Sequence, residues 1–475
     1  MNRNYRNAVL LVLLGLSLVR GVIYSAVIPP WQAPDEFRHF EYIKLLNQEW
    51  RLLTARDTSL PLQREIIASM IKHNYWKFGR ATFPFDPENP PQSFKEIIWP
   101  VDPYWLFQPP LYYLLGAFSI VLVDDNHVDL QLYVVRLMSV ILGTLVIFVA
   151  FLTAKELFPD DNFLILGIPA FIIFLPTHTF ITSTANNDNL AELLVSAVVL
   201  ILVKVYKDGF SLLKIALVGL LVMLGLLAKR TAILTVPLLL VAVPIYFWRG
   251  GSRAFHLNRK RVGLTIAVVF TGIVAGVLFW DAWQRLWATF VPRLRPYLFL
   301  IPGADFSGLL TPEGFTLLTY YARVLFESFW ARFGWMNVRL DPIWYQTMAL
   351  VSVVAMGGIG VFALRTIRKR TALARWQEKC LLLFFLCVVF AVAIAMGYSI
   401  RLWAHFRSVQ PTMKPTPQGR YLFPAIIPIA SLFMLGLREF VPTRYHRLWL
   451  LTCVSGFILL DSISLVCCII PFFYG

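Results

Sequence analysis

The feature that most constrains this chain is a series of long apolar runs. A helix needs about 17–25 residues to cross the hydrocarbon core of a bilayer, and runs of this kind lie at 9–28, 131–153, 162–178, 189–206, 211–228, 231–248, 262–283, 342–363, 379–397, 420–437 and 447–471. Because lipid offers no partner to backbone N–H and C=O groups, each run must become a helix. The sequence therefore predicts an all-α fold, a polytopic transmembrane bundle of about eleven spans that forms a single integral membrane domain over residues 1–475.

Composition narrows the class of protein further. The chain is 58% hydrophobic and 15% charged, with a mean hydropathy of +0.66. Soluble domains are nearer to one quarter charged, so a soluble enzyme, a disordered protein and a single-anchor protein with a large soluble domain are excluded. We assign the net charge of +16 to loops that face anionic cytoplasmic lipid rather than to nucleic-acid binding.

Basic residues set the expected orientation. The densest groups of Lys and Arg, at 249–261 and 365–379, fall on the same side of the predicted spans as the N-terminus. The positive-inside rule places that side in the cytoplasm. We therefore expect a protein of the plasma (inner) membrane with a cytoplasmic N-terminus. The long loops 29–130, 284–341 and 398–419 are then extracytoplasmic.

Two segments of the first long loop are expected to be helices that do not cross the membrane. Residues 109–123 are apolar but only about four turns long, and counting them as a span would reverse every later loop. We interpret them as re-entrant or interfacial. Segment 35–48 places Phe37, Phe40 and Ile43 on one face with charged residues between them, which predicts an amphipathic helix along the membrane surface.

Three acidic residues at the expected outer surface are candidate catalytic groups. Asp35 and Glu36 follow Pro34 at the start of the amphipathic helix. A carboxylate there either caps the helix or is held at the membrane surface as a general base. Asp188 lies in an Asn/Asp cluster at the outer end of a predicted span. It belongs either to a solvated turn or to a functional site at membrane level.

Basic residues on the outer side run against the positive-inside bias and need an explanation. Lys229 and Arg230 interrupt two apolar runs. They either bind an anionic headgroup or diphosphate, or extend to the interface without a ligand. The segment 398–438 has no acidic residue. It carries four basic residues, three in the third loop and one at the start of the next span: Arg401, Arg407, Lys414 and Arg420. This arginine excess indicates a local anion site, because the planar guanidinium fork suits phosphate.

Several familiar chemistries have no motif in this chain. The sequence lacks GxSxG, Walker A, GxGxxG and HExxH patterns, so it gives no signal for a serine nucleophile, a nucleotide phosphate loop or a zinc-protease helix. No two of the seven histidines fall at i, i+3 or i, i+4, so no helix offers a histidine pair to a metal. A nucleotide-driven pump is disfavoured because the phosphate loop is missing.

Four segments, taken in order, resemble those of the GT-C membrane glycosyltransferases. The first two resemble two motifs of the family: an acidic motif in the first loop and a segment that reads His-Pro-Pro-Leu-Tyr-Tyr. They correspond to Pro30-Trp31-Gln32-Ala33-Pro34-Asp35-Glu36 and to Gln108-Pro109-Pro110-Leu111-Tyr112-Tyr113, in which Gln108 replaces the histidine. In this chain His39-Phe40 follows the first of them. Residues 328–336 and 418–424 resemble a bacterial and archaeal branch of multi-span proteins grouped with the mannosyl- and aminoarabinose-transferring enzymes. The resemblance covers roughly residues 10–440.

The resemblance implies transfer of a lipid-linked sugar on the extracytoplasmic face. It implies a polyprenyl-phosphate-linked sugar as donor, and Asp35 as the base that deprotonates an acceptor hydroxyl or amine, which attacks the anomeric carbon with inversion. Glu36 and Asp188 are expected to assist by orienting donor or acceptor. The residues expected to bind substrate or phosphate are Lys229, Arg230, Arg401, Arg420, Tyr421, Gln108, Tyr112 and Arg332. Neither the sugar nor the acceptor, whether glycan, lipid or protein, follows from the sequence.

The sequence names no metal ligand. Some relatives use a divalent cation, Mg²⁺ or Mn²⁺, so the resemblance leaves such a cofactor open. No dense carboxylate cluster requires one.

Two other classes of function share part of this pattern. A transporter or flippase of lipid-linked sugars would use the same anion-binding residues, but transporters concentrate polar groups at mid-membrane on broken helices. A non-catalytic scaffold of an envelope-glycan assembly would need no carboxylate beside basic residues. The discriminating observation is whether Asp35, Asp188 and the outer basic residues converge on one cavity.

Overall fold

The computed structural model describes residues 3–53, 57–79, 83–98, 106, 108–123, 127–248, 309, 311–368, 373–409 and 415–475. For residues 3–6 and 405–409 it describes the backbone alone. The predicted span 262–283, the basic group 249–261 and the side chains of Arg407 and Lys414 lie outside this description.

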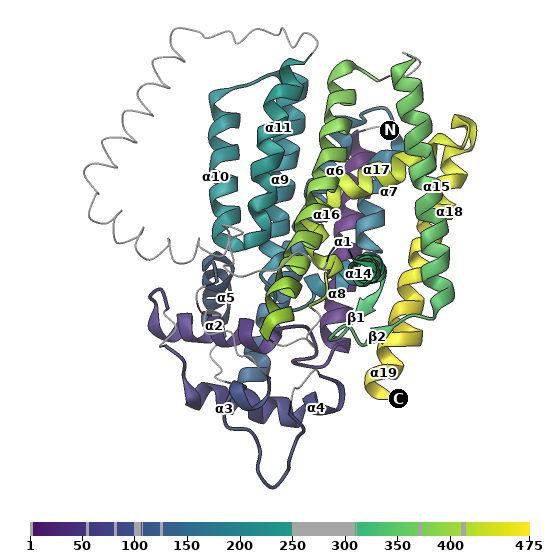
Figure 1. Ribbon diagram of the computed structural model, residues 1–475. Helices are drawn as coiled ribbons and strands as arrows, with labels where there is room; N and C mark the ends of the chain where they lie inside the picture. Colours follow the sequence, from purple (N-terminus) through teal and green to yellow (C-terminus); the bar gives the residue numbers. More distant parts are fainter. Residues whose placement is uncertain are drawn as a thin grey trace, which may run out of the picture.

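Long apolar helices form the body of the molecule (Figure 1). Within the described residues eight are long and apolar enough to cross a membrane, and the bent pair α7–α8 makes up to nine. The helices of the bundle are α1 (Arg3–Val27), α6 (Val128–Leu157), α7 (Asn162–Ile173), α8 (Pro176–Thr182), α9 (Asp188–Asp208), α10 (Leu212–Ala228), η3 (Arg230–Leu234), α11 (Thr235–Phe247), α15 (Pro342–Ile367), α16 (Arg375–Val409), η6 (Gly419–Ala425), α17 (Ile426–Glu439), η7 (Thr443–Tyr445), α18 (His446–Ser462), the π-helical η8 (Ile463–Ile469) and α19 (Ile470–Tyr474).

The all-α polytopic class is confirmed. Ten of the eleven predicted runs coincide with described helices, although α10 has only 17 residues and α7 and α8 meet at an angle of 60°. Pro176 stands at the first position of α8, where a proline begins a helix well but cannot continue the preceding one. The described strands are limited to a two-residue antiparallel ribbon, β1 (Arg332–Phe333) and β2 (Val338–Arg339).

The remaining elements form a layer below the bundle and a helix that runs across it. They are α2 (Glu36–Glu49), α3 (Leu60–Lys72), α4 (Tyr75–Phe78), η1 (Phe94–Glu96), α5 (Leu111–Val121) and α14 (Pro312–Trp330). α5 has 11 residues, about 16 Å of helix, which is too short to cross a hydrocarbon core of about 30 Å. This length agrees with its interpretation as a segment that does not span.

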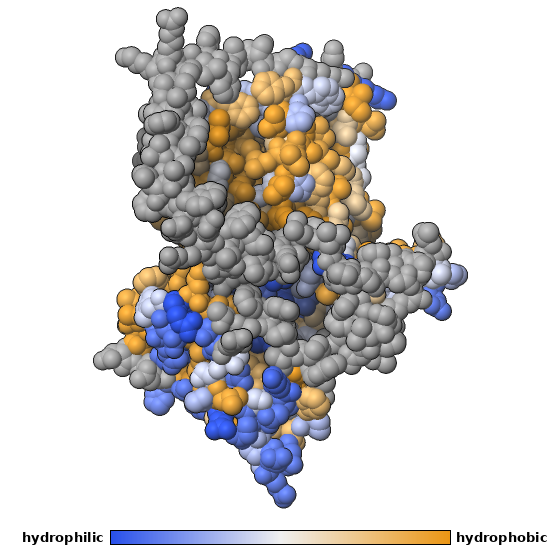
Figure 2. All heavy atoms as spheres, turned by 60° about the vertical axis from the view of Figure 1, so that its left-hand side comes forward, coloured by the Kyte–Doolittle hydropathy of each residue, from blue (hydrophilic) through white to orange (hydrophobic). Residues whose placement is uncertain are grey.

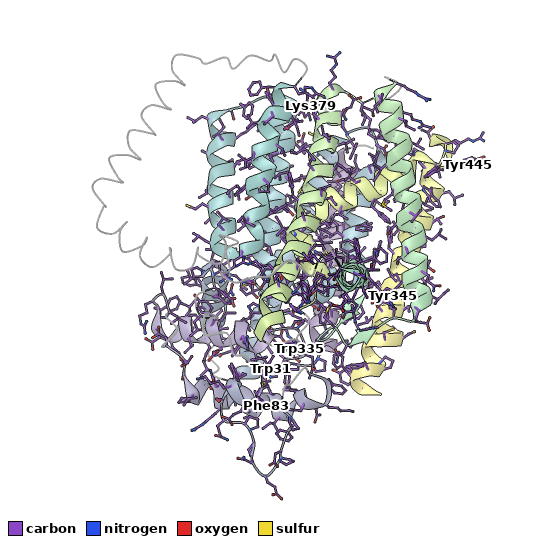
Figure 3. All side chains as sticks on the ribbon, in the orientation of Figure 1. Trp31, Phe83, Trp335, Tyr345, Lys379 and Tyr445 are labelled. Carbon is purple, nitrogen blue, oxygen red and sulfur yellow. The ribbon has the colours of Figure 1, made fainter. Side chains whose placement is uncertain are left out.

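The two ends of the bundle differ in what they carry. The connections α6–α7, α9–α10, α15–α16 and α17–α18 lie at the upper end in Figure 1, whereas α2–α4, the β1–β2 ribbon and the C-terminus lie at the lower end. Figure 3 shows Lys379 at the upper end and Trp31 and Trp335 below the bundle. The described segments predicted to be cytoplasmic thus share one end. Which side of the membrane this end faces stays a prediction.

The surface of the molecule also differs between the two ends of the bundle. Figure 2 shows hydrophobic side chains gathered over the upper body and hydrophilic ones over most of the lower layer. Exposed large hydrophobic residues on α1, α15 and α18 include Leu11, Val353 and Leu451, each at least 59% exposed. An apolar surface of this extent is expected to face lipid rather than water.

The lower layer has an aromatic core of its own. Trp31 and Phe37 are fully buried, and the Phe37 ring lies 4.8 Å from that of Phe94 and 6.1 Å from that of Tyr75, measured between ring centroids. Both ring pairs have the edge-to-face arrangement that aromatic side chains prefer. These contacts join α2, α4 and η1 into one unit.

The prediction for segment 35–48 was right about the helix and wrong about its environment. α2 is buried from Glu36 to Leu46, including its polar residues. On the face expected to be solvated, Gln63 Nε2 of α3 donates to Glu41 Oε1 at 2.6 Å, and Lys44 Nζ donates to Gln131 Oε1 of α6 at 2.8 Å. α2 is therefore covered on both faces instead of lying at an open membrane surface.

Candidate active site

A cavity of about 220 Å³ lies where the lower layer meets the bundle. Its walls come from the start of α2, the segment before α5, the start of α9, η3, the last part of α16 and η6. The lining residues are Asp35, His39, Gln108, Asn187, Lys229, Arg230, Thr231, Ile233, Ile394, Ala395, Tyr398, Arg401, Arg420 and Tyr421. The cavity therefore draws on four of the segments singled out in the sequence, those around Asp35, Gln108, Lys229 and Arg420.

Asp35 points its carboxylate at an arginine rather than at the helix that it precedes. Its backbone has φ 65° and ψ 7°, in the left-handed region, and its side chain makes no cap hydrogen bond. Aspartate tolerates this conformation better than most residues. Arg420 Nη2 donates to Asp35 Oδ2 at 3.2 Å, and the Asp35 side chain keeps 28% of its surface exposed. The helix-cap alternative is thus not what the structure contains.

Asp188 is the second carboxylate of the site, and it is buried. It stands at the first position of α9, where the helix dipole favours a negative charge. Lys229 Nζ lies 2.6 Å from Asp188 Oδ2, and Arg420 Nε lies 3.7 Å from the same oxygen. Arg420 therefore connects the two carboxylates, contacting Asp35 through Nη2 and Asp188 through Nε. The solvated-turn alternative for Asp188 is excluded by its 1% exposure.

Arg420 is held in place by close packing of η6 against α14. Gly419 leaves no room for a Cβ atom, which would overlap the backbone of Ser328 and Phe329. The backbone N–H of Gly419 donates to Ser328 Oγ at 2.8 Å. The segments 328–336 and 418–424, which are far apart in sequence, are thus parts of one contact.

The cavity has more positive than negative charge. Four basic side chains line it, those of Lys229, Arg230, Arg401 and Arg420, and the two carboxylates in contact with them are Asp35 and Asp188. The difference is two positive charges. Arg420 Nη1 is buried and has no hydrogen-bond partner among the described residues, so it is a donor that an anionic ligand would satisfy.

The local sequence suggested that the outer basic residues have no acidic partners. In the structure, Lys229 and Arg420 do have them. The acids that pair with Lys229 and Arg420 come from α9 and from the start of α2. No stretch of nearby sequence carries this information, because the partners lie up to 385 residues apart.

His39 contributes a neutral ring to the cavity wall. Burial lowers the pKa of His39 well below its usual value, and the charges of Lys229, Arg420 and Arg38 lower it further. His39 Nδ1 lies 3.0 Å from the Tyr113 hydroxyl, and the two rings are stacked. An uncharged imidazole can donate or accept a hydrogen bond there without adding to the positive charge.

Four of the predicted site residues do not line this cavity. Asp188 is connected to it through Lys229 and Arg420, with which it pairs. Glu36 is fully buried against Arg136, and Tyr112 is buried with its hydroxyl 2.9 Å from Ser139 Oγ. Arg332, in β1, lies 3.6 Å from Glu327 and lines a small separate cavity behind Arg420. Their contacts are with protein, and this favours supporting roles over contact with substrate.

The residues of the cavity do not fit a divalent cation. Among the described residues no three His, Cys, Asp or Glu side chains lie close enough together to hold a metal ion. The two carboxylates that are present each face a cationic side chain, and a divalent cation beside Lys229 and Arg420 would be repelled by both.

Sequence reasoning missed several residues that shape the site. Tyr398 and Thr231 line the cavity without belonging to any motif that we singled out. Arg136 lies within the predicted span 131–153, and a charge inside a span was the signal that could have drawn attention to it.

Comparison with known proteins places the chain in a family. A family model described as a predicted membrane protein (DUF2142) matches residues 18–429. The chain belongs to this family. Among curated proteins no match was found.

Three solved structures show a weaker similarity to this DUF2142 protein. The apo oligosaccharyltransferase of Archaeoglobus fulgidus aligns with a TM-score of 0.49 at 13% identity, over 99% of this chain and 56% of that one. The same enzyme tethered to an acceptor peptide gives 0.44 at 13% identity, over 99% and 55%. ArnT from Cupriavidus metallidurans bound to undecaprenyl phosphate gives 0.40 at 13% identity, over 98% and 73%. The chain spans about half the length of the oligosaccharyltransferase, and similarity at this level assigns no activity.

Proposed function

We propose that this DUF2142 protein is a membrane glycosyltransferase of GT-C type. In this proposal it moves a sugar from a polyprenyl phosphate to an acceptor at the extracytoplasmic face. The observation that carries the proposal is that Asp35, Lys229 and Arg420 line one cavity at the lower end of the bundle, and that the buried Asp188 pairs with two of them, Lys229 and Arg420. The motif resemblance of the first loop supplies the reaction class.

In the proposed reaction Asp35 removes a proton from the acceptor hydroxyl or amine. The acceptor atom forms a bond to the anomeric carbon as the bond from that carbon to the phosphate oxygen breaks, which inverts the configuration. The bonding electrons pass to the phosphate, and the proton remains on Asp35 until solvent takes it. Since Asp35 keeps part of its surface exposed, its proton has a route to water.

The charge of the cavity suits this leaving group. A phosphodiester donor carries one negative charge, and the phosphate monoester that leaves carries up to two. A surplus of two positive charges on the cavity side therefore matches the charge that develops during transfer better than that of the bound donor. Interactions that strengthen in this way lower the barrier instead of only tightening binding. Lys229, Arg230, Arg401 and Arg420 would supply them.

The other predicted residues divide by position. Gln108 and Tyr421 line the cavity and are placed to contact the sugar or phosphate. Tyr112, Arg332 and Glu36 hold neighbouring backbone or side chains. No metal is assigned to the reaction, because the cavity's donor set does not fit one.

The two rival functions are less well supported. A lipid-sugar flippase is expected to place its polar groups at mid-membrane, whereas this cavity lies at the junction with the lower layer. A non-catalytic scaffold would not need the arrangement seen here, in which Arg420 contacts both the partly exposed Asp35 and the buried Asp188.

The test uses the lipid-linked sugar that accumulates when the gene is deleted, identified by mass spectrometry of lipid extracts. Asp35→Asn should cause the same accumulation, because asparagine cannot accept the acceptor's proton and loss of a general base slows transfer by ~10²–10⁴-fold. Asp57→Asn is the matched control, since Asp57 also pairs with an arginine in the lower layer, Arg51 at 2.7 Å, but does not line the cavity.

The location of the accumulated lipid separates the rival functions. A blocked transferase leaves the donor in the outer leaflet, where a membrane-impermeant periodate reagent oxidises its diols, and a blocked flippase leaves it inside. Full complementation by Asp35→Asn at normal protein level would refute the assignment of Asp35 as the base.

A further inference from the structure

Arg136 and Glu36 form a buried ion pair next to the cavity. Both side chains have 0% exposure. Arg136 Nε donates to Glu36 Oε1 at 2.9 Å and Arg136 Nη2 donates to Glu36 Oε2 at 2.6 Å. This two-point contact fixes direction as well as distance.

The other donors of Arg136 hold the end of α1. Its Nη1 donates to the carbonyl oxygens of Ser25 at 2.9 Å and Ile28 at 2.7 Å, and its Nη2 donates to that of Pro29 at 3.1 Å. The Ser25 oxygen is among those that α1 leaves unpaired where it ends, and Ile28 and Pro29 follow directly after the last helical residue, Val27. Arg136, from the first third of α6, thus fixes the start of the segment that carries Asp35.

Glu36 holds two backbone segments at once. Its Oε2 accepts a hydrogen bond from the backbone N–H of Trp31 at 3.0 Å, and its Oε1 accepts one from that of Ala185 at 3.1 Å. Trp31 lies four residues before Asp35, and Ala185 lies three residues before Asp188. A single carboxylate therefore connects the backbone segments that lead to the two acids of the cavity.

We propose that the Glu36–Arg136 pair is a positioning unit that sets the geometry of residues 29–35 relative to residues 183–188, and so places Asp35 and Asp188 around Arg420. Glu36 is then a positioning residue and not a catalytic one. The catalytic part of this inference rests on the proposed function, and the structural part does not.

The substitution Glu36→Gln tests the unit with a minimal change in shape. Each Glu36 oxygen accepts from Arg136 and from one backbone N–H. Whichever way the amide is turned, its NH₂ group faces two donors, so one backbone N–H loses its acceptor. A buried N–H without a partner is costly. The same NH₂ group also loses one of the two contacts with Arg136, so the coupled unit loosens and both segments should open more often.

Hydrogen exchange of the full-length protein in detergent reads this out without any substrate. Peptides covering 29–35 and 183–188 should both exchange faster in Glu36→Gln than in the parent. Arg136→Lys is the second variant, in case Glu36→Gln does not fold, and it should speed exchange in both segments because one ammonium group cannot replace the guanidinium contacts.

Glu439→Gln is the matched control. Glu439 is also a glutamate with a side chain of low exposure, 5%, held by two arginines, Arg365 at 2.7 Å and Arg438 at 3.1 Å, but it lies at the opposite end of the bundle. Its substitution should leave exchange in both segments unchanged. If Glu36→Gln speeds exchange in only one of the two segments and leaves the other at the parental rate, the segments are not coupled and the inference is overturned.

Transfer kinetics test the catalytic consequence. With the donor found in the deletion strain, Glu36→Gln should lower kcat on the order of 10²-fold, the cost of a misplacement of about 1 Å, and leave KM for the donor unchanged. A rise in KM at unchanged kcat would instead make Glu36 part of donor binding and refute the positioning role. If the parent shows no transfer while the exchange results hold, the proposed function fails and the positioning unit stands.

Discussion

Lys229 and Arg420 contact the same buried carboxylate, yet they have different surroundings. Lys229 faces Asp188, whereas Arg420 reaches both Asp188 and Asp35 and has a buried Nη1 donor that is not used within the described residues. Removal of Arg420 therefore changes the environment of two acids, and removal of Lys229 changes that of one. This difference bears on how the two residues are tested.

Arg420→Ala and Lys229→Ala should each weaken binding of undecaprenyl phosphate. A hydrogen bond to a charged group contributes about 1.5–3 kcal/mol, so each substitution should raise the Kd by a factor of about 10 to 150. Binding to purified protein is measured by native mass spectrometry, with Arg51→Ala as the control because Arg51 pairs with Asp57 away from the cavity. Parental affinity in both variants would mean that these cations do not bind phosphate.

Glu41 introduces a pH dependence into the lower layer. Burial raises the pKa of Glu41 to about 7 from a usual value of 4.5, while the hydrogen bond from Gln63 and the charge of Arg38 oppose the rise. The folded state therefore holds its proton more tightly than the unfolded state. The contribution to stability is complete below about pH 4.5 and is lost as the pH rises through about 7.

Glu41→Gln should remove this dependence. The parent's melting temperature should fall between about pH 4.5 and pH 7, and the fall should be smaller in Glu41→Gln, because the amide stays uncharged. The measurement is thermal unfolding of the detergent-solubilised protein over this pH range. Glu88→Gln, at an exposed position of the same layer, should follow the parent. Identical slopes for Glu41→Gln and the parent would contradict the prediction.

At the scale of elements, the helices could be predicted and the links between them could not. An apolar run determines a helix because lipid leaves no other way to pair the backbone, so the predicted spans correspond to real helices wherever the chain is described. Hydropathy averages, however, conceal single charges such as Arg20 on α1, which pairs with Asp461 on α18. A charge within a span is a signal in itself, but its partner is known only from packing.

Amphipathic periodicity also has a limit as a predictor. The pattern of α2 correctly indicated a helix, and its charged residues suggested an exposed face. In the fold, α3 and α6 supply polar partners to that face, so burial costs little. Sequence alone gives the period of a helix and not the number of its neighbours.

Gly419→Ala should damage the site through the contact between η6 and α14. A Cβ at this position would overlap the backbone of Phe329, and overpacking of this kind costs about 1–3 kcal/mol. We expect a lower melting temperature and weaker binding of undecaprenyl phosphate, because Arg420 follows directly. Gly456→Ala is the control, since nothing lies within 4 Å of a Cβ there. Unchanged binding in Gly419→Ala would show that η6 does not depend on this contact.

At the scale of the whole molecule, the sequence singled out segments that the fold brings together, but it did not show how they meet. The segments around Asp35, Gln108, Lys229 and Arg420 were singled out one by one, and the fold brings them to one cavity. The pairing of each acid with a particular base depends on which helices are neighbours, for example α9 with η6. That information is spread over hundreds of residues and has no local pattern.

The orientation of the molecule can be tested by cysteine labelling. Cys467 is exposed and Cys468 partly so, so both are first replaced by serine. In that background a membrane-impermeant maleimide added to intact cells should label Glu88→Cys, in the lower layer, and leave Thr443→Cys, in the connection between α17 and α18, unlabelled until the membrane is opened. Both residues are exposed. The opposite pattern would place the cavity in the cytoplasm and contradict an extracytoplasmic reaction.

The 385 residues between Asp35 and Arg420 also have a consequence for biosynthesis. At elongation rates of about 5–20 residues per second, the ribosome needs roughly 20–80 s to produce Arg420 after Asp35 has been made. During that interval the first carboxylate is already in place without its guanidinium partner, and the cavity lacks one wall. A nascent chain is thus inserted in the membrane well before this cavity is complete, which delays any reaction there until Arg420 has been made.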